Sequence, residues 1–117
     1  MAMTVLIVDD HPSFRASART LLEAEGYEVV GEAEDGESAI QAVARLHPDL
    51  VLLDIQLPDI DGFEVAERLR DSGERAAVVL TSSRDGEDYA RCIECSGAKG
   101  FVAKAELSGA ALSKLLT

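Results

Sequence analysis

The sequence has few basic residues: 11 lysines and arginines stand against 22 aspartates and glutamates, giving a formal net charge of -11. An acidic chain repels a polyanion, so the composition argues against direct binding of nucleic acid by these residues. Metal cations and basic protein surfaces are the partners that such a charge favours.

Long apolar runs are also absent. No hydrophobic stretch approaches the length of a membrane-spanning helix, and no basic N-terminal segment precedes an apolar one. We therefore expect neither membrane insertion nor secretion, and the sequence favours a cytoplasmic protein.

Cysteine is scarce, since Cys92 and Cys95 are the only two and can form at most one disulfide bridge. They lie three residues apart on a predicted helix without further ligands nearby, so we expect reduced, packed side chains rather than a zinc or redox site. The sequence also has no histidine pair and no Ser-His arrangement that could provide a catalytic nucleophile.

Internal repeats, low-complexity tracts and linkers are missing too, so the 117 residues are predicted to form a single domain, 1–117. Short apolar segments alternate five times with segments of helical periodicity. The predicted strands are Thr4–Val8, Tyr27–Ala33, Leu50–Leu53, Ala76–Leu80 and Gly100–Ala103. The predicted helices start with one capped by Asp10 that ends near Glu25, followed by Glu37–Leu46, Phe63–Arg70, Glu87–Cys95 and Leu107–Leu116.

This alternation predicts an α/β fold, because strands joined by helices pair in parallel through right-handed crossovers. The second strand mixes charged and apolar residues, which suits a sheet edge partly open to water. Placing it there gives a doubly wound, five-stranded parallel sheet of order 2-1-3-4-5, the three-layer (βα)5 sandwich of flavodoxin-like proteins. The second helix is expected to bury Ile40, Val43 and Ala44.

Polar residues follow several of the predicted strands: Asp9 and Asp10, then Asp54, Ser82 and Lys104. The strand order brings these ends into one crevice, where open α/β sheets bind ligands. Clustered carboxylates repel one another unless a cation joins them, and oxygen ligands with an open face suit Mg²⁺. Acids, a metal, a lysine and a hydroxyl describe a phosphoryl site, with Asp54 as the nucleophile.

Some of these residues also fit simpler roles. Asp9 and Asp10 alone are equally typical of a helix cap. Phe14 fits either a core position or a partner-facing one, and the core is favoured. The run Asp59 to Gly62 superficially matches a calcium loop or a phosphatase motif, but the residues around it depart from both patterns.

The ordered set of motifs resembles the receiver domains of two-component response regulators along the whole chain. It comprises the acid pair at 9–10, D-x-x-x-P-x-x-x-G from Asp54 to Gly62, Ser82, and GAKGFVAK ending at Lys104. The segment DDHPSFRASARTLLEAEGYEVVGEAEDG is most similar to receivers of LuxR/NarL-type regulators.

The resemblance implies that Asp54 accepts a phosphoryl group from a sensor histidine kinase or a small phosphodonor, as a switch and not as a turnover enzyme. It implies Mg²⁺ held by Asp10, Asp54 and the backbone carbonyl of Gln56, with Asp9 acting partly through water. Lys104 and Ser82 would bind the phosphoryl oxygens.

The resemblance also implies how the signal is timed and passed on. The side chains of Gln56 and Arg84 would tune the lifetime of the phosphoryl group. Ser82 would move towards the phosphate and Phe101 would turn into the space it leaves, changing the face formed by the fourth helix, last strand and fifth helix, through which phosphorylated copies pair. Two residues differ from those that are common in this family. Phe101 replaces a tyrosine. Ala105 replaces a proline, so the sequence is compatible with either a cis or a trans Lys104-Ala105 bond.

Competing functions remain. A receiver-like interaction module would not use phosphate, and a Mg²⁺-dependent phosphohydrolase would need a substrate pocket and a cap insertion that the short loops do not provide. The chain is compatible both with the front part of a DNA-binding transcription regulator and with a complete protein.

Overall fold

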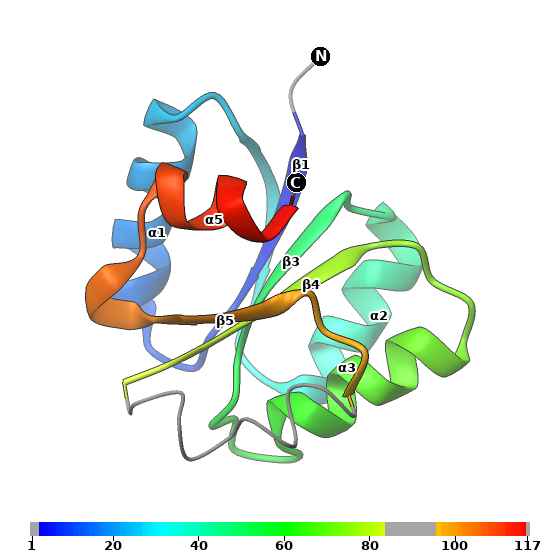
Figure 1. Ribbon diagram of the computed structural model, residues 1–117. Coiled ribbons are helices and arrows are strands. Elements are labelled where there is room, and N and C mark those ends of the chain that lie inside the picture. The colour runs from blue at the N-terminus through cyan, green and yellow to red at the C-terminus, as the bar shows by residue number, and fades with distance from the viewer. Residues whose placement is uncertain (1–2, 84–95, 117) are drawn as a thin grey trace.

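A five-stranded parallel sheet forms the centre of the computed structural model, which describes residues 3–83 and 96–116 (Figure 1). The strand order is β2-β1-β3-β4-β5, so the predicted fold is confirmed. The strands are β1 (Thr4–Val8), β2 (Glu28–Ala33), β3 (Leu50–Asp54), β4 (Ala77–Ser82) and β5 (Gly100–Ala103). The predicted helix Glu87–Cys95, with both cysteines, and Arg84 lie outside the described residues.

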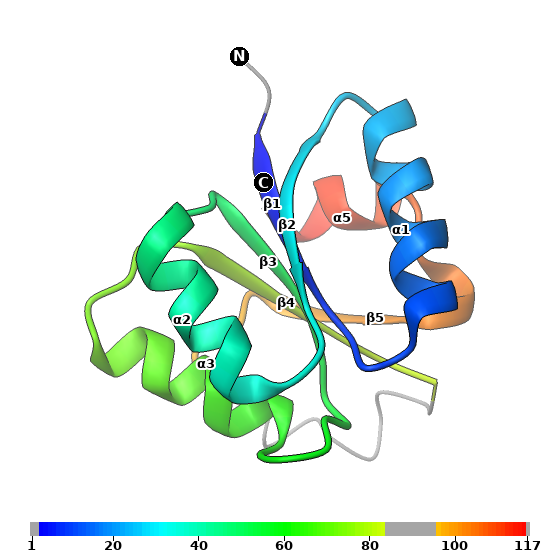
Figure 2. The same ribbon diagram turned by 180° about the vertical axis from the view of Figure 1, so that it is seen from behind.

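Helices cover both faces of the sheet. Figures 1 and 2 show α1 (Pro12–Ala24) and α5 (Gly109–Leu116) on one side, which we call the α1/α5 face. On the other side, the α2/α3 face, lie α2 (Gly36–Leu46) and α3 (Gly62–Asp71). None of the helices in the described ranges has the length and apolar character needed to cross a membrane.

Each strand contributes side chains to both apolar layers, because successive side chains point to opposite faces. On β3, Leu50 and Leu52 pack in the α1/α5 layer, whereas Val51 and Leu53 pack in the α2/α3 layer. All four are at most 1% exposed. Burying such a side chain contributes roughly 1.5–3 kcal/mol, so the central strands hold the strand ends, and the polar residues on them, in fixed positions.

The start of α1 differs from the prediction. His11, not Asp10, is its N-cap residue, and no side chain caps the helix. The Asp9 carboxylate instead accepts a hydrogen bond from the His11 N–H at 2.8 Å. Pro12 at the first helical position has no N–H to be capped, which lowers the need for an acidic cap.

Two further boundaries differ from the prediction by two residues, and one buried face was predicted wrongly. β4 continues to Ser82, because Thr81 and Ser82 still pair with Val102 and Ala103. α5 begins at Gly109, since Lys104–Glu106 form a separate 3₁₀ turn. Ala44 is exposed; the buried stripe of α2 runs through Gly36, Ala39, Ala42 and Val43, and Ile40 is only partly buried.

The other end of α2 behaves as the sequence indicates. His47 precedes Pro48 and leaves the helical region, adopting a left-handed conformation with φ of 47°. No peptide bond within the described residues is cis, so the Lys104-Ala105 bond is trans.

Candidate functional site

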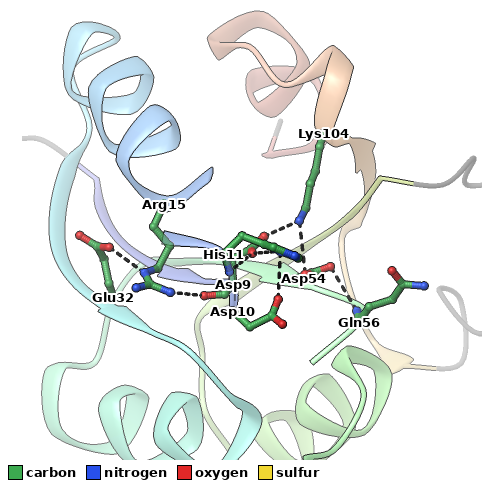
Figure 3. A network of polar contacts seen from close by, with 8 residues as sticks. All are labelled: Asp9, Asp10, His11, Arg15, Glu32, Asp54, Gln56 and Lys104. Atoms are coloured by element: carbon green, nitrogen blue, oxygen red, sulfur yellow. Dashed lines mark hydrogen bonds and ion pairs between the residues drawn. The ribbon is translucent and has the colours of Figure 1, made fainter. Parts of the chain in front are cut away.

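Three residues from distant parts of the chain meet at the carboxyl edge of the sheet. Asp9 follows β1, Asp54 is the last residue of β3, and Lys104 follows β5. The Lys104 Nζ lies 2.6 Å from Asp9 Oδ2 and 3.3 Å from Asp54 Oδ2 (Figure 3). Asp9 is 0% exposed and Asp54 2%. The sheet therefore holds two buried carboxylates against one ammonium, as its predicted order requires.

Asp10 and His11 lie next to Asp9 and add two possible metal ligands to this pocket. The His11 Nδ1 lies 3.0 Å from Asp9 Oδ1 and 3.0 Å from Asp10 Oδ1. Ligand atoms of Asp9, Asp10, His11 and Asp54 all lie within 4.8 Å of one another. Such a cluster has the spacing of a metal site, and its carboxylate oxygens are the ligands that a hard divalent cation prefers.

The surroundings of Asp54 disfavour its charge. Burial raises the pKa of the Asp54 carboxyl, and the neighbouring Asp9 carboxylate raises it further. The Gln56 backbone N–H, which donates to Asp54 Oδ1 at 3.1 Å, and the Lys104 ammonium act in the opposite direction but do not outweigh the burial. An added cation would therefore relieve an electrostatic cost at this residue.

Lys104 responds to the same acids. Burial alone would lower the pKa of the Lys104 ammonium, but its contacts with Asp9 and Asp54 outweigh burial and raise the pKa above its ordinary value. Its Nζ also lies 4.6 Å from the centre of the Phe14 ring, a distance at which the ring attracts a cation. Phe14 itself is partly buried in the α1/α5 layer, which agrees with the core interpretation.

Gly62 permits the tight packing beneath Asp54. A Cβ at this position would lie 2.5 Å from the Asp54 carbonyl oxygen and 2.8 Å from the Ile55 Cα. The Gly62 N–H donates to the Ile55 carbonyl at 2.8 Å. The glycine that ends the D-x-x-x-P-x-x-x-G motif is thus needed because the first turn of α3 touches the backbone of the strand end.

Asp59 has a role that the sequence did not reveal. Its carboxylate accepts hydrogen bonds from the backbone N–H groups of Gly36, at 2.8 Å, and Glu37, at 2.9 Å. These bonds, the Gly36 bond foremost, lower the pKa of the Asp59 carboxyl. Asp59 therefore ties the loop after Asp54 to the start of α2, a contact between distant segments that leaves no local pattern.

Arg15 was likewise missed as a structural residue of the site. Its Nη1 donates to the Asp9 carbonyl oxygen at 2.6 Å, and its Nε donates to Glu32 Oε1 at 3.0 Å (Figure 3). Arg19 holds the other oxygen of Glu32 at 2.9 Å from its Nη2. The arginines thus link α1 to the edge strand β2 and fix the backbone at Asp9.

The other predicted site residues that the structure describes differ in their burial. Ser82 is fully buried at the end of β4, Phe101 is partly buried in the α2/α3 layer, and the Gln56 side chain is exposed. Thr81, which the sequence analysis did not single out, is 1% exposed beside Asp54 in the sheet. Both histidines are exposed, with side chains 64% accessible at His11 and 69% at His47.

Comparison of the sequence with known proteins relates this chain to one family. Residues 5–116 match the sequence model of the response regulator receiver domain. The chain is 45% identical over 103 residues to a transcriptional regulator of Pseudomonas aeruginosa, with 87% of this chain and 49% of that protein covered. It is 36% identical over 104 residues to the DNA-binding transcriptional activator EvgA of Escherichia coli, with 89% of this chain and 51% of that protein covered.

One solved structure is similar to this chain in its fold as well as in its sequence. The signal receiver domain of the response regulator NarL from Mycobacterium tuberculosis superimposes with a TM-score of 0.86 at 33% identity, covering 98% of this chain and 97% of that one. This chain spans about half the length of the curated relatives it matches.

Proposed function

The chain belongs to the response regulator receiver domain family, and on that premise we propose that Asp54 accepts a phosphoryl group from the phosphohistidine of a sensor histidine kinase or from a small phosphodonor. The observation that carries the proposal is the contact of one ammonium, Lys104 Nζ, with the buried carboxylates of Asp9 and Asp54. Such a pocket combines a carboxylate nucleophile with a cation that can hold phosphoryl oxygens.

The transfer is a displacement at phosphorus. A carboxylate oxygen of Asp54 forms a bond to phosphorus while the bond from phosphorus to the donor nitrogen breaks. The donor imidazole keeps the electron pair of that bond and takes up a proton from water. In the product, the Lys104 ammonium pairs with one phosphoryl oxygen, and the Ser82 hydroxyl donates a hydrogen bond to another. The protein is a switch modified once per cycle, in contrast to a turnover enzyme.

The donor set of the pocket fits Mg²⁺. Asp9, Asp10 and Asp54 supply carboxylate oxygens in one small volume, and Asp9 Oδ2 is buried without a hydrogen bond, its contact being the Lys104 ammonium. The side chains of Asp10 and Asp54 and the Gln56 carbonyl would hold the ion, with Asp9 acting partly through water. When bound, Mg²⁺ supplies the positive charge that neutralises the attacking carboxylate and the phosphoryl oxygens.

Ser82 and Phe101 transmit the change in this proposal. Ser82 moves towards the phosphoryl group, and the ring of Phe101 turns into the space that Ser82 leaves, which alters the surface of β5 and α5. Phe101 has no hydroxyl, so the new position is held by packing alone. The Gln56 side chain and Arg84 tune how fast water removes the phosphoryl group.

The output proposed is control of transcription in the cytoplasm, supported by the descriptions of the relatives as transcription regulators. With a net charge of -11, these residues do not contact DNA themselves in this proposal. Phosphorylated copies pair instead through the face that includes β5 and α5, which places DNA-binding segments of a longer protein side by side.

Mass spectrometry after incubation with acetyl phosphate and Mg²⁺ tests the function. The wild-type chain is expected to gain one labile phosphoryl group, as an acyl phosphate on a carboxylate should be, and Asp54→Asn none. Asp59→Asn is the matched control, because Asp59 lies in the adjoining loop but points to α2, and it should gain the group normally. Turnover of many small phosphate esters would instead indicate a phosphohydrolase, and an unmodified wild type would indicate an interaction module that does not use phosphate.

A further inference from the structure

Two buried side-chain atoms in the described ranges have no hydrogen-bond partner, and both belong to residues at the carboxyl edge of the sheet. They are Asp9 Oδ2 and Thr81 Oγ1. Asp9 Oδ2 at least has the Lys104 ammonium 2.6 Å away, whereas no residue of the described ranges gives the Thr81 hydroxyl a partner. A buried hydroxyl without a hydrogen-bond partner is unfavourable, so Thr81 raises the free energy of this state of the protein.

The sheet register places Thr81 beside Asp54. β4 lies between β3 and β5, and Thr81 pairs with Asp54 on one side and with Val102 on the other. Paired residues of neighbouring strands lie about 5 Å apart. The Thr81 side chain is therefore an immediate neighbour of the proposed phosphoacceptor.

The alternation of side chains sets the direction of the hydroxyl. Leu52 and Val79 both pack in the α1/α5 layer, so Asp54 and Thr81, two residues further along the same strands, project to that same side. Val102 packs there too, and Lys104 follows it by two residues. Thr81 thus lies between Asp54 and Val102 in one row of side chains across the sheet, whereas Ser82 projects to the opposite face.

We propose that Thr81 is a second hydroxyl of the phosphoryl site, whose Oγ1 acquires its hydrogen-bond partner when Asp54 carries a phosphoryl group. This inference rests on the proposed function and adds to it a residue separate from Ser82. A phosphoryl group brings nearly two negative charges and strong acceptor oxygens to Asp54. The unpaired hydroxyl then becomes the donor of a charge-assisted hydrogen bond, which is stronger than a neutral one.

The consequence is a bias towards the loaded state. The hydroxyl raises the free energy of the unloaded protein, because it is buried without a partner, and lowers that of the loaded protein through the new bond. A valine at this position has a similar shape and no hydroxyl, so it removes both contributions. Thr81→Val should therefore act oppositely on the two states, which a purely structural role in the core would not produce.

The test measures thermal unfolding of wild type, Thr81→Val and Thr81→Ser, each alone and with Mg²⁺ and beryllofluoride, which stands in for the phosphoryl group. Alone, Thr81→Val should melt at or above the wild-type temperature. With beryllofluoride, wild type and Thr81→Ser should gain more than Thr81→Val, whose affinity for beryllofluoride should fall about tenfold, equivalent to about 1.4 kcal/mol. Thr20→Val, a threonine exposed on α1, is the matched control and should keep the wild-type affinity.

Two results would overturn the inference. One is an equal beryllofluoride affinity in wild type and Thr81→Val. The other is a Thr81→Val protein that melts below wild type without beryllofluoride, or does not fold, because the hydroxyl would then be bonded already in the unloaded state. If wild type neither responds to beryllofluoride nor gains a phosphoryl group from acetyl phosphate, the proposed function itself fails and this inference falls with it.

Discussion

Asp59 Oδ1 accepts a hydrogen bond from the Gly36 N–H at 2.8 Å, so the loop that follows the strand of Asp54 is fastened to the start of α2. The second oxygen of the same carboxylate takes the N–H of Glu37. One side chain thus satisfies two backbone donors at a helix N-terminus, where a negative charge is also favoured by the helix dipole.

Asp59→Ala should therefore destabilise the fold. Loss of a carboxylate that caps a helix costs about 1 kcal/mol, and the free energy of unfolding measured with urea should fall by that amount. Glu67→Ala, an exposed acid on α3, is the control and should leave it nearly unchanged. Equal stability of Asp59→Ala and wild type would show that water replaces the carboxylate at no cost.

The contribution of Asp59 should depend on pH with a defined sign. Because the pKa of the Asp59 carboxyl is lowered below its ordinary value in the folded protein, the carboxylate stabilises the fold fully above the unfolded pKa. That contribution is lost as the pH falls through the lower, folded pKa. The stability difference between wild type and Asp59→Ala should be largest near neutral pH and shrink in acid, as measured by urea unfolding at several pH values.

Asp54→Asn should stabilise the protein in metal-free buffer at neutral pH. Burial and the Asp9 carboxylate raise the pKa of Asp54, so its ionised form destabilises the fold at any pH above the folded pKa, and a neutral amide removes that cost. Thermal unfolding should show a higher midpoint for Asp54→Asn. The gain should disappear as the pH falls through the raised pKa and should shrink when Mg²⁺ is added. Asp71→Asn, a largely exposed acid, should show no such gain.

Lys104→Met should have the opposite effect. Removing one partner of a buried ion pair leaves an uncompensated charge, so we expect a loss of about 3 kcal/mol in metal-free buffer. Mg²⁺ should restore part of the loss, because it returns positive charge to the two carboxylates. Lys99→Met removes an exposed lysine and should be nearly neutral in the same urea titration. A loss at Lys104 that Mg²⁺ leaves untouched would speak against a shared cation pocket.

Gly62→Ala should damage both stability and the proposed phosphorylation. The added Cβ meets backbone atoms of Asp54 and Ile55, and forced overpacking costs typically about 1–3 kcal/mol. Gly73→Ala is the control, because its cost comes from a φ of 80° with open space around the Cβ. Both variants should unfold more easily, but only Gly62→Ala should slow the gain of phosphate from acetyl phosphate.

The strands and the main site residues were predictable because both follow from local rules. Strands buried on both faces read as short apolar runs, such as Leu50 to Leu53, and the parallel order then brings Asp9, Asp54 and Lys104 to one edge. The Asp59 and Arg15 contacts were not predictable, since they join surface segments that share no periodicity. The end of β4 was misjudged because Thr81 and Ser82 are polar, yet their backbones continue the ladder.

The contact between Asp9 and Lys104 joins the two ends of the described chain, which bears on how the protein matures during synthesis. β1 and β3 leave the ribosome early and can pair at once, so their acids gather before any counter-charge has been made. Lys104, the ammonium that contacts Asp9 and Asp54, is added only when β5 docks. We therefore expect nascent chains halted before Gly100 to stay protease-sensitive, and addition of β5 and Lys104 to protect the sheet.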